Sequence, residues 1–505
     1  MGQAVEDDVQ ALLMSESPHS RMVGGTEYSW CKAVSGGTGT TVLAAMFQSD
    51  TVSASLLQDA LDLLQVAHPR LRSRLLWIHG RPALSVSSTP IATLQVLQAR
   101  EFISQELGML DTANSDGKID DYNDDKGAWL KLVERELNIN SQWKEQSHSL
   151  EPQPMMALTL YIGIELADEC DSGSSHSLLV LRLHTAICDR ASAATILTEL
   201  MHILSKLRSN DTPVLKDDLR TIGEKHEEDS ATSLVAIEDA IPKGQAHKPF
   251  WAHGLDILGY SLGSRRHSML PFENVEQSER HSEIICKKLG TEDTQKLLKE
   301  CKEQRTSRLG VLTAAVLKAT AILKEVGAQS ERHAVVTLLD CRHRLEPTMP
   351  KSTVGFYHSA VLNTHLVQGE EVQFWELARQ CSEAVETAVK RRKHFTDMGD
   401  VGLLMCQAIQ MPQLTPWGSL RTSTLVVFEE AVEDDDAAAD MKQSVGLIDY
   451  VGCSSVHGVG PSIAIFDTIR QGALHCTCVY PCPLHSRTQI NQLLDTMVSI
   501  LVNMA

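Results

Sequence analysis

Residues 178–190 read LLVLRLHTAICDR, an apolar run that ends at His184 and reaches Asp189 five positions later. A short, uninterrupted apolar run of this kind is typical of a buried β-strand. The residues after Asp189 form an apolar stripe at helical spacing, made of Ala193, Ile196, Leu197, Leu200, Met201, Leu204 and Leu207. The stretch therefore predicts a strand that ends at the histidine, a short loop before the aspartate, and a helix.

Strands and helices alternate on both sides of this stretch. Upstream, TTVLAAMFQS (40–49) predicts a strand, and the amphipathic helix that follows it ends at Pro69. Downstream, strands at SEIICKKL (282–289) and HAVVTLLDCR (333–342) flank two helical segments. Alternation in both halves predicts the α/β class, with two lobes that each consist of a sheet covered by helices.

The length of the chain also favours two lobes. It has 505 residues, whereas one hydrophobic core rarely serves more than about 250–300 residues. A charged, proline-containing segment near the middle is expected to join the lobes. We expect an N-terminal extension over 1–40, an N-terminal lobe over 41–207, a linker over 208–250 and a C-terminal lobe over 251–505.

Two acidic segments, 111–127 and 429–440, are expected to be solvated insertions within the lobes. The first does not match an EF-hand, because aligning its glycine puts Thr112 and Asn123 where calcium needs Asp and a bidentate Glu. The whole chain has 46 Lys and Arg against 65 Asp and Glu, a net charge of −19. This balance argues against nucleic-acid and anionic-membrane partners.

Neither a signal peptide nor an apolar stretch of the ~20 residues that cross a bilayer is found, so we expect a cytoplasmic protein. Its twelve cysteines are then expected to be reduced thiols. Cys476, Cys478 and Cys482 lie close together, but no second ligand pair stands at zinc-like spacing. We therefore expect core thiols there and no metal site.

Several motifs follow one another along the chain: HPRLRSRL (68–75), LRLHTAICDR (181–190), DCRHRLEP (340–347) with VGFYHS (354–359), and a terminal strand, strand, helix unit. Their order resembles the coenzyme-A-dependent acyltransferase superfamily, which includes chloramphenicol acetyltransferase, plant HxxxD acyltransferases and peptide-synthetase condensation domains. The resemblance extends from about residue 40 to the end. It implies two similar chloramphenicol-acetyltransferase-like lobes with a tunnel at their junction, which admits acyl donor and acceptor from opposite faces.

The resemblance also implies roles for the residues around His184. In the family motif HHxxxDG the second histidine deprotonates the acceptor, and the aspartate fixes the local structure. Asp189 matches the aspartate, His184 the first histidine, Thr185 the second histidine and Arg190 the glycine. The base is thus replaced by a threonine, whose hydroxyl cannot take up a proton at neutral pH. Because strand side chains alternate, His184 and Thr185 are expected on opposite faces.

Each candidate residue has a structural interpretation beside the functional one. His184 is the leading candidate for a base, with a buried histidine bonded to the backbone as the equal alternative. Asp189 is expected to organise the loop by pairing with an arginine, and Arg190, Arg342 and Arg344 are the candidate partners.

Two further residues bear on catalysis. Cys188 adjoins the motif, but a thiol nucleophile would need a nearby base, and core packing accounts for it more simply. His457 lies in the glycine-rich segment SSVHGVGP (454–461) and is the alternative base elsewhere in the chain, or a residue that contacts substrate from a loop.

Together these features favour an acyltransferase that moves an acyl group from a thioester to a hydroxyl or amine of a small-molecule acceptor. Acyl-CoA would be a co-substrate, and no cofactor or metal is expected. His184 and Asp189 would be catalytic, and Thr185, Arg190 and His457 would contact substrate. A catalytically silent relative that binds ligand in the same tunnel, and a different reaction such as cyclisation or elimination, remain open. We expect a monomer.

Overall fold

The computed structural model describes residues 20–48, 51–103, 128–144, 152–165, 175–209, 234–249, 251–255, 257–258, 267–268, 270–274, 279–327, 329–368, 373–411, 426–429, 432–433, 444–458 and 462–504. The acidic segment 111–127 lies outside these residues, as do most of the expected linker 208–250 and of the acidic loop 429–440.

The N-terminal lobe is built on a five-stranded sheet whose central strands are β2 and β8. Its order is β14 (Leu447–Val456), β2 (Thr38–Gln48), β8 (His176–His184), β7 (Met156–Ile164) and β5 (Leu94–Gln98). Every residue of β8 is buried, as its apolar run predicts. Leu179, Leu181 and Leu183 face a core shared with the helices α3 (Ala54–Ala67) and α6 (Arg190–Arg208). The helix α5 (Ala128–Leu137) covers the opposite face.

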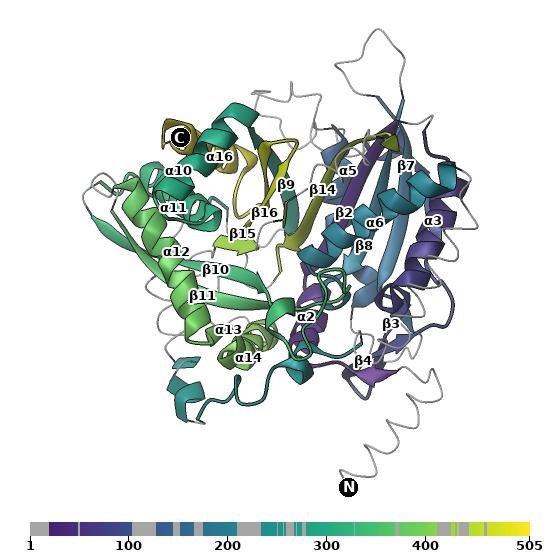
Figure 1. The fold of residues 1–505 in the computed structure, drawn as a ribbon, viewed down its shortest axis with the longest axis horizontal. Coiled ribbons are helices and arrows are strands. Elements are labelled where there is room, and N and C mark those ends of the chain that lie inside the picture. The colour runs from purple at the N-terminus through teal and green to yellow at the C-terminus, as the bar shows by residue number, and fades with distance from the viewer. Residues whose placement is uncertain are drawn as a thin grey trace.

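The edge strand β14 comes from the second half of the chain. It pairs antiparallel with β2, with Ser454 opposite Thr41, so the range expected to form the C-terminal lobe also completes the N-terminal sheet. Figure 1 shows the yellow β14 beside the purple β2. Within the expected N-terminal extension, the helix α2 (Gly25–Ser35) buries Cys31, Ala33 and Val34.

A small four-stranded sheet, in the order β1 (Arg21–Met22), β4 (Arg81–Val86), β3 (Ser73–Ile78) and β6 (Gln153–Pro154), joins this lobe. The hairpin β3–β4 turns at His79 and Gly80, both with positive φ. Short 3₁₀ segments, η1 (Pro69–Arg72), η3 (Ser141–Trp143), η5 (Thr185–Ile187) and η6 (Ile237–Ala240), complete the connections.

The C-terminal lobe is built on a seven-stranded sheet. Its path is β11 (His358–Gln368), β10 (Ser330–Asp340), β12 (Val426–Glu429), β15 (Ile463–Arg470), β16 (Ala473–Cys482) and β9 (His281–Leu289), and β13 (Val432–Glu433) pairs with β15. Its helices are α10 (Thr291–Glu303), α11 (Arg308–Leu323), α12 (Phe374–Lys390), α13 (Lys393–Thr396), α14 (Met398–Gln410) and α16 (Arg487–Met504). The helices α10, α11, α12 and α16 share one apolar core with this sheet.

The two lobes lie side by side (Figure 1) and share a core at their junction. Val42 and Val180 of the N-terminal sheet belong to the same buried cluster as Ile284, Phe466 and Val479 of the C-terminal sheet. The alternation of strand and helix therefore yields the two expected sheets, held against each other by apolar contact. Over the described ranges, no single helix is long and apolar enough to cross a membrane, and only the pair α10–α11, bent by 106°, passes that test jointly.

Candidate active site

A cavity lies at the junction of the two lobes, where β8 ends and α6 begins. Its empty volume is about 1040 Å³, including the space at its mouth. Both sheets contribute to its walls, with Thr41 from β2 and Ser454 from β14 on one side and Leu338 from β10 and Phe466 from β15 on the other. Most of its lining is apolar with interspersed hydroxyl groups, the composition typical of a small-molecule site. No histidine is among the described residues that line it.

Asp189 lies in the cavity wall, and both of its carboxylate oxygens accept hydrogen bonds. Its Oδ1 accepts the Ser192 backbone N–H at 2.8 Å, which caps α6, and its Oδ2 accepts the Tyr357 backbone N–H at 2.8 Å. Nη2 of Arg342 lies 3.0 Å from Oδ1 and 2.9 Å from Oδ2. Burial works against ionisation, but Arg342, His358 and these hydrogen bonds outweigh it and lower the pKa of Asp189 to about 2.

Arg342 is therefore the arginine partner that was expected for Asp189, and it comes from the other lobe. It lies in the 3₁₀ segment η7 (Arg342–Arg344) just after β10 and is itself buried. Its guanidinium also donates to Asp340 Oδ1 at 2.9 Å and to the Thr353 carbonyl at 3.0 Å. The pair thus joins the start of α6 to the end of β10 across the lobe junction, which is a positioning role for Asp189.

His184 does not reach the cavity. Its ring is absent from the described cavity lining that includes Thr185, and it lies edge-on to Trp143 with 5.3 Å between ring centroids. Nδ1 accepts the Ala186 backbone N–H at 3.1 Å, and Nε2 has no hydrogen-bond partner among the described residues. Complete burial lowers the pKa of His184 to about 3, so the ring is neutral at physiological pH. This placement corresponds to the buried structural histidine and gives the ring no contact with a ligand in the cavity.

Thr185, at the position of the expected base, does line the cavity. Its hydroxyl donates to the Gly39 carbonyl, which can only accept. In the 2.9 Å contact between Thr41 Oγ1 and Thr185 Oγ1, Thr41 must therefore be the donor. By the same reasoning Ser454 donates to Thr41 in their 3.0 Å contact. The result is a polarised hydroxyl chain, defined as Ser454, Thr41 and Thr185, that ends on the Gly39 carbonyl.

Arg190 also lines the cavity, and its guanidinium is directed to the C-terminal lobe. Nη2 donates to the Asp467 carbonyl and to Thr468 Oγ1, the latter at 3.0 Å. Nη1 lies 4.0 Å from the Asp467 carboxylate and has no hydrogen bond within the part of the chain that the structure describes. Asp467 is held in turn by Arg308, whose Nε lies 2.9 Å from Oδ2. Arg190 is thus a buried cation with hydrogen-bonding capacity left beside the cavity.

His457 lies just outside the described lining, after the end of β14. Its Nδ1 is 3.0 Å from Ser282 Oγ. Nε2 packs against Gly37, where an added Cβ would lie only 2.2 Å away. Burial and the nearby charges of His281 and Arg280 lower the pKa of His457 to about 4. Both ring nitrogens are therefore in contact with protein, and the structure brings this residue near the cavity without lining it.

Sequence reasoning missed the partners of Thr185. Thr41 and Ser454 meet because β14 pairs with β2 in a register that places these two residues opposite each other. Cys188 lines the cavity beside Asp189, and its thiol lies 3.4 Å from the Asp189 carbonyl. No signal in the sequence marked Ser454, because its partner strand lies some four hundred positions earlier.

No family model and no curated protein matches this sequence. Solved structures do match. The trichothecene 15-O-acetyltransferase from Fusarium sporotrichioides is 10% identical with a TM-score of 0.64, and the match covers 96% of this chain and 95% of that chain. The first condensation domain of the calcium-dependent antibiotic synthetase is 13% identical with a TM-score of 0.60, and the match covers 96% of each chain.

A third similar structure is the NRPS cyclization-docking bidomain from Sorangium cellulosum. It is 11% identical with a TM-score of 0.61, and the match covers 96% of this chain and 84% of that chain. At this level of identity the likeness concerns the fold. It confirms the prediction that this chain has the two-lobed, chloramphenicol-acetyltransferase-like architecture shared by acyltransferases and condensation domains.

Proposed function

We propose that this protein is an acyltransferase that moves an acyl group from a thioester, such as acyl-CoA, to a small-molecule acceptor bound in the cavity between the lobes. The observation that carries the proposal is the cavity itself. It lies where the Asp189–Arg342 pair joins the lobes, and a hydroxyl chain stands where the family resemblance puts the base.

The direction of the hydrogen bonds in the hydroxyl chain determines which kind of catalysis the cavity can support. Because the Thr185 proton is directed at the Gly39 carbonyl, Thr185 can accept a hydrogen bond but does not serve as a general base. Catalysis then rests mainly on holding donor and acceptor together, which can contribute roughly 7–11 kcal/mol at its upper limit.

This arrangement favours an amine over an alcohol as the acceptor. A neutral amine attacks the thioester carbonyl carbon with its own lone pair, whereas an alcohol attacks well only when a base removes its proton. The C–S bond then breaks, the sulfur leaves with the bonding electrons, and the proton released by the amine ends on the thiolate. The products are an amide and a free thiol.

Arg190 would contact the substrates in this scheme. Its guanidinium belongs to a mostly apolar cavity wall, and Nη1 has no hydrogen-bond partner among the described residues. A guanidinium in such surroundings binds a carbonyl, carboxylate or phosphate oxygen strongly because little water competes. We assign Arg190 to orienting an oxygen of the acyl donor or of the acceptor.

The second candidate is a catalytically silent protein that binds a small molecule in the same cavity. It is favoured by one observation, the lack of a histidine among the described residues of the cavity wall. A reaction other than acyl transfer is a third candidate, since one protein of similar fold is named as a cyclization domain.

Matched acceptors separate these candidates. The purified full chain is incubated with a panel of acyl-CoAs and with amine and alcohol acceptors of the same carbon skeleton. Release of free thiol and the mass of the product are followed together. We expect equal amounts of thiol and amide, with much slower ester formation. Saturable acyl-CoA binding by calorimetry without any product from either acceptor would support the silent protein and overturn the acyltransferase.

Variants of the hydroxyl chain connect any turnover to the cavity. Thr185→Val removes the hydroxyl and should lower kcat, while Thr185→His should raise ester formation relative to amide formation. The control is Thr496→Val, a similar change at a partly exposed position of α16 whose hydroxyl donates to the Gln492 carbonyl of the same helix. Equal effects of Thr185→Val and Thr496→Val would place the reaction elsewhere.

A further inference from the structure

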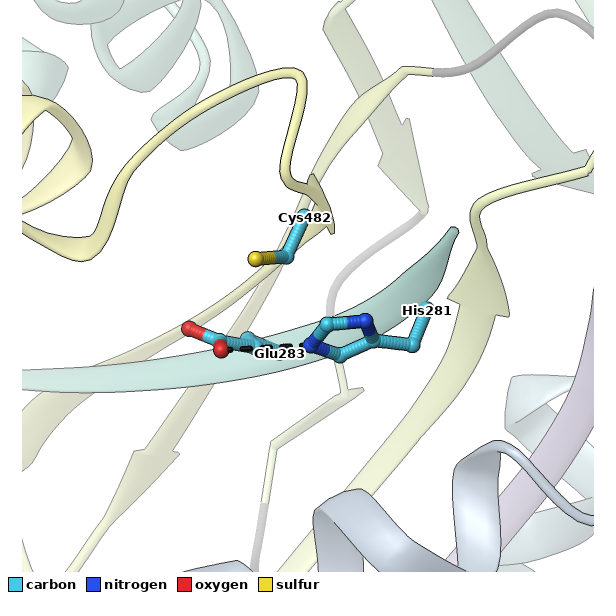
Figure 2. Close-up of side chains that lie close together, drawn as sticks. All are labelled: His281, Glu283 and Cys482. Carbon is cyan, nitrogen blue, oxygen red and sulfur yellow. Dashed lines mark hydrogen bonds and ion pairs between the residues drawn. The ribbon is translucent and has the colours of Figure 1, made fainter. Parts of the chain in front are cut away.

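Three side chains of metal-binding type meet at the edge of the C-terminal sheet. His281 and Glu283 stand two residues apart on β9 and so share one face. Cys482 ends β16 directly opposite His281 in the antiparallel register. Figure 2 shows the imidazole, the carboxylate and the thiol turned toward one common space. Segments distant in the sequence thus supply nitrogen, oxygen and sulfur to one place.

The distances suit a single ion. Nε2 of His281 lies 3.4 Å from Glu283 Oε1, and one donor atom of each residue lies within 4.8 Å of the others. Donors bound to one tetrahedral zinc at about 2.0–2.3 Å stand roughly 3.3–3.8 Å apart. The imidazole and the carboxylate already have this separation. Reducing the other donor–donor distances to the same range takes side-chain movements of about 1 Å. The His281 side chain is 46% exposed, so an ion can reach it from solvent.

The carboxylate of Glu283 is held in place through one oxygen, while the other, Oε1, remains on the side of His281. The oxygen that is held, Oε2, accepts the Tyr480 hydroxyl and lies 3.6 Å from Arg487 Nε. Tyr480 stands opposite Glu283 in the same register that places Cys482 opposite His281. Hydrogen bonds of this kind orient a ligand and are a regular part of metal sites.

We propose that His281, Glu283 and Cys482 bind a zinc ion through Nε2, Oε1 and Sγ, with water in the fourth position. The choice of metal follows from the donors, since thiolate and imidazole favour zinc, whereas calcium and magnesium take oxygen ligands. On binding, the thiol gives its proton to solvent, and no electrons are exchanged.

The residues around this site connect it to the lobe junction. Ser282, between two of the ligands, accepts the Val456 backbone N–H at 2.9 Å and donates its own backbone N–H to Asn138 Oδ1 at 2.8 Å. Ile284 donates its backbone N–H to Glu134 Oε1 at 2.9 Å. These partners belong to the N-terminal lobe. A zinc ion would therefore stabilise the start of β9, the segment that makes these contacts between the lobes. It should therefore raise the melting temperature.

Zinc titration of the chelator-treated full chain tests the site. We expect one zinc bound per chain by calorimetry, an increase in Tm, and, with cobalt as the probe, absorption bands of a four-coordinate ion with one thiolate ligand. Cys482→Ser should abolish the thiolate band, and His281→Gln should abolish stoichiometric binding. Tyr480→Phe should weaken zinc binding about 10- to 100-fold, because it frees the carboxylate to move.

Cys286→Ser is the matched control, because it removes a thiol from the same strand outside the cluster. It should leave zinc affinity and the cobalt spectrum unchanged. Each variant is first compared with the wild type in metal-free form by circular dichroism and Tm. His281→Gln changes a half-exposed residue and decides the matter if Cys482→Ser does not fold. Absence of zinc binding to the wild type, or binding unchanged in folded His281→Gln, would overturn the proposal.

Discussion

Asp189→Asn is the most informative single change in the lobe junction. Asparagine has nearly the same shape, so its Oδ1 can still accept from Ser192 and Arg342. Its amide nitrogen, however, takes the place of Oδ2 and meets two donors, the Tyr357 backbone N–H at 2.8 Å and Arg342 Nη2 at 2.9 Å. The variant thus removes a charge and creates a contact between donors, while the volume stays constant.

The magnitude follows from burial. Both side chains are almost completely buried, and removing one partner of such a pair typically reduces the free energy of unfolding by 3–5 kcal/mol. Arg342 keeps Asp340 and the Thr353 carbonyl, so we expect the lower end, about 3 kcal/mol.

The pH dependence gives a second measure of the same interaction. The pKa of Asp189 is lowered from 3.8 to about 2 in the folded protein. Its contribution is therefore present above about pH 4 and is lost as pH falls toward 2, which corresponds to roughly 2 kcal/mol. Asp189→Asn should remove this part of the acid sensitivity.

Urea unfolding of the wild type, Asp189→Asn, Arg342→Met and the double variant forms the assay, and Asp59→Asn at an exposed position of α3 serves as the control. The cycle should give a coupling free energy of about 0.5–3 kcal/mol between the two residues. A loss below about 1 kcal/mol in Asp189→Asn, together with additive single changes, would refute the claim that this pair joins the lobes.

Three further outcomes can be checked. His184→Phe should reduce the loss of stability between about pH 6.5 and pH 3, because the neutral folded ring has a pKa of about 3 and the unfolded chain binds the proton in that range; urea midpoints against pH measure it. Arg190→Met should weaken acyl-CoA binding about 10-fold or more by calorimetry, since it removes a charged hydrogen-bond donor from the cavity wall. Gly37→Ala should lower the free energy of unfolding by more than about 1 kcal/mol, because its φ is +97° and the new Cβ would collide with His457.

Local pattern predicted the centre of the fold well. The apolar run before His184 is β8, and the helical stripe after Asp189 is α6, which begins at Arg190. These elements follow from side-chain periodicity, which the sequence displays directly. Two lobes with helix-covered sheets also followed from length and alternation.

Strand partners could not be predicted in the same way. The periodicity of 447–456 is compatible with a strand but does not say which strand it joins, and β14 crosses to β2 in the other lobe. The choice among Arg190, Arg342 and Arg344 as the partner of Asp189 was open for the same reason. Only the packing of η7 against the start of α6 decides it, and Arg190 turns instead to Asp467.

The cluster of His281, Glu283 and Cys482 shows what spacing along the sequence leaves out. Cys482 was discounted as a metal ligand because no second ligand pair stood near it in the sequence. Two potential donors stand on β9 with the spacing His-x-Glu, and the antiparallel register brings them opposite Cys482. Ligand spacing along the chain is informative for sites within one hairpin or helix, whereas strands that pair over a long range can build a site without it.

The environment of Thr185 bears on whether this protein has merely lost a catalytic base. If a histidine had been replaced with no other adjustment, the hydroxyl that took its place would be expected to stay unpaired. Instead the Thr185 hydroxyl donates to the Gly39 carbonyl and accepts from Thr41, which accepts from Ser454. The threonine is thus integrated into a hydrogen-bonded chain across three segments, while the Asp189–Arg342 pair keeps the lobes in place. This consistency favours a cavity built to position its ligands over one that has decayed.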